Sequence, residues 1–191
     1  MTIEELLKEH EQYIRSSGDD GKQLSIESID MKKYYKDGII LEQAVMSACS
    51  FDNLNINYID FYSSELYESS FRNCNIEWCE FVRAELDDAN FSNSTLIMTK
   101  FDNAEMFNTD FSGAIIQNCS FKDAQMFSVD FTNAALQNIN FDGAKIDHIK
   151  VKGAKIIAPN NLDKVACISI DIGNEILEGE KAKEWLKYNA R

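Results

Sequence analysis

The sequence has few basic residues, few histidines and no long apolar segment, and each shortage argues against a class of function. Its 191 residues include 19 lysines and arginines against 32 aspartates and glutamates, a formal net charge of −13. Because binding of phosphates requires clustered lysine and arginine, we expect no direct binding of nucleic acid, and anionic membranes are disfavoured likewise. No segment approaches the ~20 apolar residues that cross a bilayer. Glu4 and Glu5 stand where an export signal would be basic and apolar, so we expect a cytoplasmic protein.

Signals for catalysis and metal binding are also scarce. The chain has two histidines, His10 and His148, and neither has a serine or cysteine partner in a recognisable motif. The sequence contains no glycine-rich phosphate loop and no cysteine pair at metal-ligand spacing. Four of the five cysteines instead occupy the small position of a repeat, where a thiol packs as an apolar filler: Cys49, Cys74, Cys79 and Cys119. We therefore expect no enzyme, no catalytic residue, no cofactor, no metal site and no disulfide.

What the sequence does contain is an unbroken period of five from Phe51 to Ile146. A large apolar residue occupies every fifth position, and a mostly small residue lies two positions before it. The large residues are Phe51, Ile56, Phe61, Leu66, Phe71, Ile76, Phe81, Leu86, Phe91, Leu96, Phe101, Met106, Phe111, Ile116, Phe121, Met126, Phe131, Leu136, Phe141 and Ile146. On a helix or a flat strand these residues would rotate around every face. The period instead favours a chain that turns a corner about once per repeat, so that successive coils stack.

The repeat units resemble those of the bacterial pentapeptide-repeat family. The family's motif is a small residue, Asp or Asn, Leu or Phe, a polar residue, and Gly or another small residue. TDFSG at residues 109–113 matches it at every position, and AALQN at residues 134–138 looks similar. The resemblance implies an all-β solenoid, a right-handed quadrilateral β-helix with four repeats in each coil. About seven coils, each ~4.8 Å high, would form a column roughly 30 Å long.

We expect a cap at the N-terminal end of this column. Residues 1–23 are predicted to form a capping α-helix, starting with a capping box of Thr2 and Glu5, and a linker. The helix would lie across the apolar end of the first coil, with His10 packed there. Residues 24–158 would form the β-helix, with an irregularity near Lys32–Lys36.

The C-terminal residues 159–191 are predicted to close the other end. The repeat phase stops at an exit turn over 159–161, which a strand over Val165–Ile172 and a helix within Glu178–Ala190 follow. In some members of the family a C-terminal segment forms a head-to-head dimer. Trp185 and Leu186 therefore either close the last coil or join two subunits.

Residues twenty positions apart should stack in rows on the outside of the column, and three rows differ from a plain polar coat. One row is apolar, the second is aromatic, and the third is a carboxylate ladder. Their members are Tyr58, Trp78 and Met98; Tyr67, Phe107 and Phe127; and Glu65, Glu85 and Glu105. Clustered apolar residues on a surface usually mark a contact with a partner. The alternative is that they rest on one another or are covered by the terminal segments.

Two functions of different classes remain open. Members of the quinolone-resistance branch of the family imitate duplex DNA and bind DNA gyrase, and residues 51–150 carry sixteen acidic against six basic residues. The resemblance thus implies a DNA-mimicking modulator of gyrase. The alternative is an immunity or regulatory scaffold that docks one protein on the aromatic rows and has no topoisomerase role.

Overall fold

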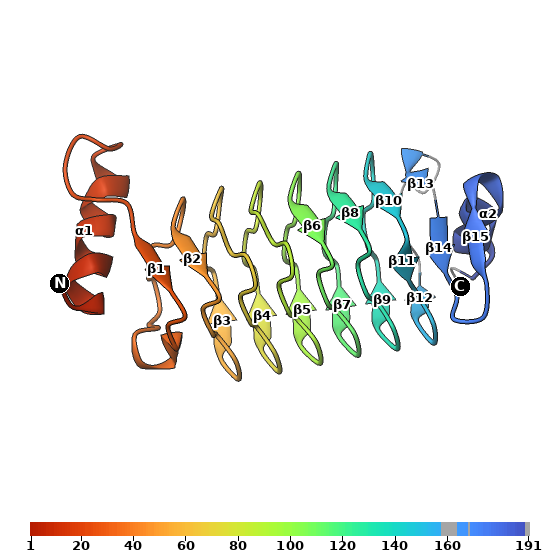
Figure 1. The fold of residues 1–191 in the computed structure, drawn as a ribbon, viewed down its shortest axis with the longest axis horizontal. Helices are drawn as coiled ribbons and strands as arrows, with labels where there is room; N and C mark the ends of the chain where they lie inside the picture. Colours follow the sequence, from red (N-terminus) through yellow and green to blue (C-terminus); the bar gives the residue numbers. More distant parts are fainter. Residues whose placement is uncertain (158–163, 168, 190–191) are drawn as a thin grey trace.

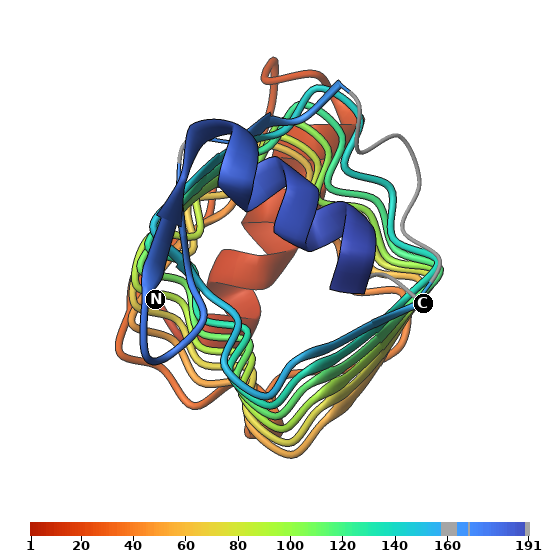
Figure 2. The ribbon, with the colours of Figure 1, turned by 90° about the vertical axis from the view of Figure 1, so that its right-hand side faces the viewer.

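The chain forms a parallel β-solenoid of about seven coils with a helix at each end, as the sequence predicts (Figure 1). It is analysed as a computed structural model that describes residues 1–157, 164–167 and 169–189. An end-on view shows a four-sided outline with α1 (Ile3–Arg15) and α2 (Gly179–Asn189) lying across its two ends (Figure 2). The helices therefore cover the ends of the column rather than its sides.

Short strands form two opposite sides of the column. We call them the β6 face and the β4 face (Figure 1). The β6 face contains β1 (Ser25–Glu27), β2 (Val45–Ser47), β6 (Glu105–Phe107), β8 (Gln125–Phe127), β10 (Lys145–Asp147) and β13 (Ala166–Cys167). The β4 face contains β3 (Asn55–Asn57), β4 (Asn75–Glu77), β5 (Thr95–Ile97), β7 (Ile115–Gln117), β9 (Ala135–Gln137) and β12 (Lys155–Ile157).

The register between coils is twenty residues throughout the repeats. Ile56 pairs with Ile76, which pairs in turn with Leu96, and isolated bridges continue the same register on the other two sides, as from Glu80 to Lys100. Every pairing within the repeats is parallel, so each residue lies directly above its counterpart in the next coil. The rows that the sequence predicts are therefore real features of the surface.

Phenylalanines fill the interior as two facing stacks. Phe91 lies 4.7 Å from Phe71 and 4.9 Å from Phe111, in nearly parallel stacking, and meets Phe81 and Phe101 edge to face. The two strand-bearing faces supply aliphatic residues instead. This division explains why the large residues alternate along the sequence between phenylalanine and Leu, Ile or Met.

The N-terminal cap is joined to the first coil by a buried histidine. Thr2 and Glu5 form the predicted capping box at the start of α1. His10 is fully buried, and its Nδ1 accepts a hydrogen bond of 3.1 Å from the backbone N–H of Leu24. The predicted irregularity is a 3₁₀-helix over Met31–Lys33, which leads into a loop.

The C-terminal end differs in detail from the prediction. Instead of one strand over Val165–Ile172, there are two short strands in different sheets, β13 and β14 (Ser169–Asp171). β14 pairs in parallel with β11 (Ile149–Lys150) and antiparallel with β15 (Ile176–Glu178), which the sequence analysis missed. The predicted exit turn over 159–161 lies outside the described residues.

Across the described ranges, no helix is long and apolar enough to span a membrane.

We predict that Phe91→Ala destabilises the column by about 3–5 kcal/mol, because it leaves a cavity inside a continuous stack. Among the described residues Phe141 stacks only on Phe121, so Phe141→Ala should cost clearly less. Urea unfolding followed by circular dichroism would compare the two variants. Equal losses would contradict the view that stacking on both sides holds the coils together.

We also predict that acidification loosens the N-terminal cap. Burial lowers the pKa of His10 below its ordinary value, partly opposed by the backbone carbonyl of Glu42. The unfolded chain therefore takes up a proton below about pH 6.5 that the folded chain excludes, so this contribution to stability is present above that pH and is lost below it. Amide-exchange protection of Leu24 should fall between pH 7.5 and pH 5.5. His10→Gln should remove this dependence, and His148→Gln should retain it; retention in His10→Gln would contradict the assignment.

Candidate functional site

The three predicted glutamates stack in consecutive coils on the β6 face. Glu65 is bridged to Glu85, and Glu85 to Glu105, so their side chains leave the backbone about 4.8 Å apart. Burial, and then the charges of Glu65, Glu105 and Asp87, raise the pKa of Glu85 above its ordinary value. The ladder is therefore an arrangement of mutually repelling charges.

Three further carboxylates widen this ladder into what we call the acidic patch, comprising Glu65, Glu68, Glu85, Asp87, Asp88 and Glu105. Its polar contacts are with uncharged groups: Asp87 accepts from the backbone N–H of Phe107, Asp88 from Asn108 and Glu105 from Gln125. Within the described ranges none of the six forms an ion pair.

Some carboxylates on the other faces are neutralised by cations from adjacent coils. Asp52 pairs with Arg72 at 2.6 Å, and Glu80 pairs with Lys100 at the same distance. Both pairs span twenty residues of sequence. The acidic patch contains no such pair among the described residues, so its six carboxylates keep their charge side by side on one face.

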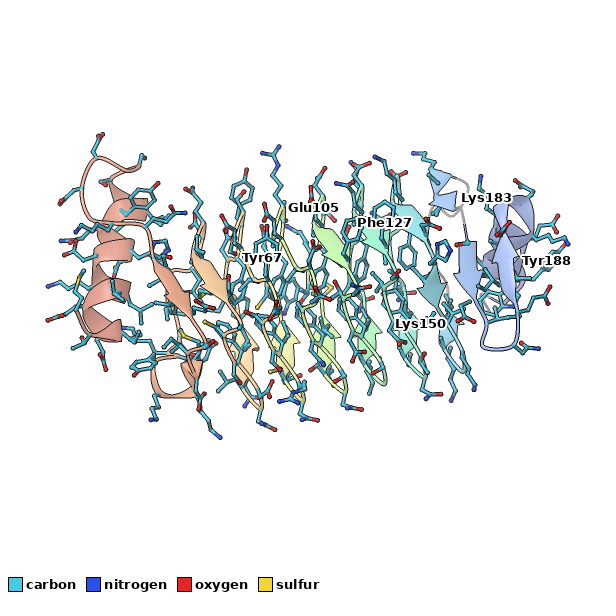
Figure 3. All side chains as sticks on the ribbon, viewed as in Figure 1. Tyr67, Glu105, Phe127, Lys150, Lys183 and Tyr188 are labelled. Carbon is cyan, nitrogen blue, oxygen red and sulfur yellow. The ribbon has the colours of Figure 1, made fainter. Side chains whose placement is uncertain are left out.

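Aromatic side chains lie on the same face beside the acidic patch. Phe107 and Phe127 stack with centroids 4.7 Å apart and planes inclined by 13°, and Phe107 remains 45% exposed. Tyr67 is half-buried and separated from this pair by Asp87. Figure 3 shows Tyr67, Glu105 and Phe127 along the same side of the column. The structure thus joins two of the predicted rows into one surface.

The third predicted row lies away from the β6 face. We call this row the apolar ridge, and its members are Tyr58, Trp78 and Met98. These residues immediately follow β3, β4 and β5, the strands of the opposite face (Figure 1). They are 75%, 47% and 38% exposed, and the Tyr58 and Trp78 rings lie 6.3 Å apart and nearly parallel. The helices α1 and α2 lie at the ends of the column, so neither covers the ridge. Tyr58 and Trp78 do rest on one another, as one alternative in the sequence analysis had it, and both rings still remain exposed.

Sequence reasoning missed the contribution of Tyr35. Its hydroxyl accepts a hydrogen bond of 3.3 Å from the backbone N–H of Asn57, so the irregular loop covers the start of the β4 face. A groove of about 680 Å³ separates this loop from α1, and its wall contains Leu7, Tyr34 and Ile39. Because Tyr35 lies outside the repeat phase, no periodicity could place it.

The two residues predicted for dimerisation pack against their own column. Leu186 is buried and lines a small cavity of about 10 Å³ with Phe141 and Ile146 at the end of the core. Trp185 is half-buried on the same helix. These positions agree with closure of the last coil, and a homodimer through this element stays a prediction.

The inward cysteines have the properties of packing residues. Burial raises the pKa of Cys74 to about 11, that of Cys79 to about 12 and that of Cys119 to about 11. Such thiols are protonated at neutral pH and are therefore poor nucleophiles and poor metal ligands. Groups of three or more His, Cys, Asp or Glu suited to a metal ion do not occur among the residues that the structure places.

Comparison with known proteins identifies the repeats. Residues 69–106 and 104–143 match the family described as pentapeptide repeats, in eight copies. None of the curated proteins compared matches the chain. The matched residues include the middle coils that carry Trp78, Glu85 and Phe107.

Solved structures with a similar fold include two from cyanobacteria and one resistance protein. HetL of Nostoc sp. strain PCC 7120, a pentapeptide repeat protein involved in heterocyst differentiation regulation, is 15% identical over 83% of this chain and 79% of its own, with a TM-score of 0.44. Rfr23 of Cyanothece 51142 is 15% identical over 64% of this chain and 84% of its own, with a TM-score of 0.35. Full-length QnrB1, a plasmid-mediated fluoroquinolone resistance protein, is 12% identical over 80% of this chain and 92% of its own, with a TM-score of 0.31.

We predict that the double variant Glu65→Gln, Glu105→Gln lowers the pKa of Glu85 and stabilises the protein at pH 7 by about 0.2–1 kcal/mol, because like charges directly opposite one another are destabilising. A raised pKa means that the contribution of Glu85 to stability is present below its unfolded pKa and is lost as the pH rises through its folded pKa. The stabilisation should therefore disappear near pH 4. Side-chain NMR titration and urea unfolding would measure both effects, and an unchanged Glu85 pKa would contradict the repulsion.

Proposed function

We propose that this chain, which is a pentapeptide-repeat protein, acts as a non-catalytic module that binds another protein in the cytosol. The interior of the column is filled by stacked phenylalanines, so a substrate has no place inside it. The sides of the middle coils carry exposed aromatic side chains and uncompensated charge. A binding function needs only these surfaces.

The observation that carries this proposal is the composition of the β6 face. Six carboxylates without a cation partner among the described residues lie beside a stacked phenylalanine pair, of which Phe107 is exposed and Phe127 half-buried. Apolar anchors rimmed by charges of one sign are typical of protein interfaces, in which the charges steer a partner of opposite sign. The partner that fits is a protein with a basic surface and an apolar centre.

DNA gyrase is the specific partner that we propose. Its DNA-binding surface must be basic, and the three coils from Glu65 to Glu105 place six carboxylates within about 10 Å of column. Duplex DNA carries about six phosphates over the same length. The ladder continues with Gln125 and Lys145, so the imitation of DNA extends over three coils rather than over the whole column.

A second candidate function is favoured by the exposure of the apolar ridge. A tyrosine that is 75% exposed beside a stacked tryptophan is an unusual surface for a protein without a partner there. An immunity or regulatory scaffold would dock its partner on this ridge and would have no effect on topoisomerases.

The test is a titration of the purified protein into a gyrase supercoiling reaction at about 50 mM and about 300 mM salt. We expect inhibition, or protection from a quinolone, at submicromolar concentrations and a clear loss of effect at the higher salt, since exposed charges are screened. The triple variant Glu65→Gln, Glu85→Gln, Glu105→Gln should weaken the effect at least tenfold. Its matched control changes the same net charge on other faces: Asp102→Asn, Asp110→Asn, Asp123→Asn.

The outcomes separate the gyrase partner from the site. Absence of any effect up to tens of micromolar would exclude gyrase as the partner. Equal weakening by the two triple variants would show that total charge matters and would contradict the β6 face as the binding site. Phe107→Ala should weaken the effect without changing its salt dependence, because it removes an anchor and no charge.

A further inference from the structure

The apolar ridge occupies a position where large residues are unfavourable. Tyr58, Trp78 and Met98 have φ angles of 58°, 57° and 54°, the left-handed region that suits glycine and asparagine. The same row continues with Asn118 and Asn138, which adopt that conformation at lower cost. Three consecutive coils therefore replace the favourable residue with a bulky, exposed one. Strain that packing does not require is characteristic of functional sites.

A groove of about 290 Å³ runs beside the ridge. Trp78 and Met98 form one wall, Cys79 and Thr99 lie between, and the ion pair of Glu80 with Lys100 lies on the far side. One wall is thus apolar and the other is polar. This shape suits an extended side chain that combines an aliphatic stem with a polar end.

The carboxylates that border the ridge select the charge of the occupant. Glu77 accepts one hydrogen bond at Oε1, from Asn75 at 3.1 Å, and Asp60 accepts one at Oδ1, from the backbone N–H of Tyr62 at 2.7 Å. In the described part of the chain, neither acid has an ion-pair partner, and the second oxygen of each accepts no hydrogen bond. A cation with several N–H groups could donate hydrogen bonds to the remaining oxygen of either carboxylate.

The chain itself contains the same type of contact one side further along the coil. The guanidinium of Arg83 lies 5.9 Å from the centre of the Tyr62 ring, and its Nη1 donates to the Tyr62 hydroxyl at 3.1 Å. Guanidinium groups stack on aromatic faces and present a planar fork of donors to carboxylates, which an ammonium group does not. Among the residues that the structure places, no arginine lies over the Tyr58 or Trp78 ring, so both rings offer such a face.

We propose that the apolar ridge binds an arginine-bearing segment of a partner protein. The guanidinium stacks on the Tyr58 and Trp78 rings and donates to Glu77 or Asp60, while the neighbouring apolar side chain of the segment packs on Met98. This site specifies the partner chemistry of the second candidate function and is independent of the β6 face.

The test is a two-dimensional NMR titration with acetylated, amidated tripeptides. The probes are Arg-Leu-Arg, Lys-Leu-Lys and Gln-Leu-Gln. The protein has two tryptophans, so the indole N–H of Trp78 reports the ridge and that of Trp185 serves as an internal control. We expect Arg-Leu-Arg to shift the Trp78 signal with a millimolar dissociation constant, Lys-Leu-Lys to bind about threefold more weakly, and Gln-Leu-Gln to produce no shift.

Variants locate the binding. Glu77→Gln with Asp60→Asn should weaken the arginine peptide at least threefold, whereas Glu105→Gln on the β6 face should leave the shift unchanged. Tyr58→Asn should weaken binding and also raise the unfolding temperature by about 2–4 °C, because asparagine relieves the left-handed strain. Trp78 remains as the reporter in each variant.

Three results would overturn the proposal. They are no Trp78 shift at saturating peptide, an equal shift with the glutamine peptide, and a loss of binding in Glu105→Gln that matches the loss at the ridge. A lower unfolding temperature in Tyr58→Asn would show that Tyr58 is retained for stability, which would contradict the argument from strain. None of these results depends on the gyrase assay, so failure of one proposal is distinguishable from failure of the other.

Discussion

The structure depends on the parallel, twenty-residue register between coils. Apart from turn bonds such as that from the Ala84 N–H to the Phe81 carbonyl, the backbone hydrogen bonds of each coil go to adjacent coils. Each interior phenylalanine also stacks on its counterpart, so no coil can bury its core alone. The same register also stacks surface residues that are twenty positions apart into rows. A glutamate repeated at the same position becomes a ladder of like charges, and an exposed aromatic residue gains a stacking partner one coil away.

The register also explains which features the sequence could predict. Core positions and outward rows follow from counting in fives and twenties, and the structure places Glu65, Glu85 and Glu105 together as that count requires. Ion pairs were harder to predict from the sequence. The twenty-residue spacing brings Arg72 above Asp52, but it does not determine which carboxylates form an ion pair. The terminal segments have no repeat. No sequence period could therefore predict the hairpin of β14 and β15 or the position of Tyr35. Both depend on tertiary contacts with the folded column.

We expect both candidate surfaces to lower the stability of the fold, each in a different way. The acidic patch places like charges in adjacent coils where neutral side chains would serve, as Gln125 does one coil further. The ridge holds Tyr58 and Trp78 in a backbone conformation that asparagine adopts more easily in the same row. Neither feature improves the packing of the core, which is complete beneath them. Residues that reduce stability without helping the interior are most simply explained by contacts with another molecule.

The capped column determines how such contacts can form. Open ends of a β-solenoid would pair with other chains, and α1 and α2 cover them, with His10 and Leu186 anchoring the two caps to the core (Figure 2). The caps thus leave the sides of the column for the binding that we propose. The acidic patch lies on the β6 face and the ridge follows the strands of the opposite face, so a flat partner surface can contact only one of them. A rigid rod with two dissimilar sides can therefore hold two different segments at a fixed separation, and the filled core makes that separation insensitive to what binds on either side.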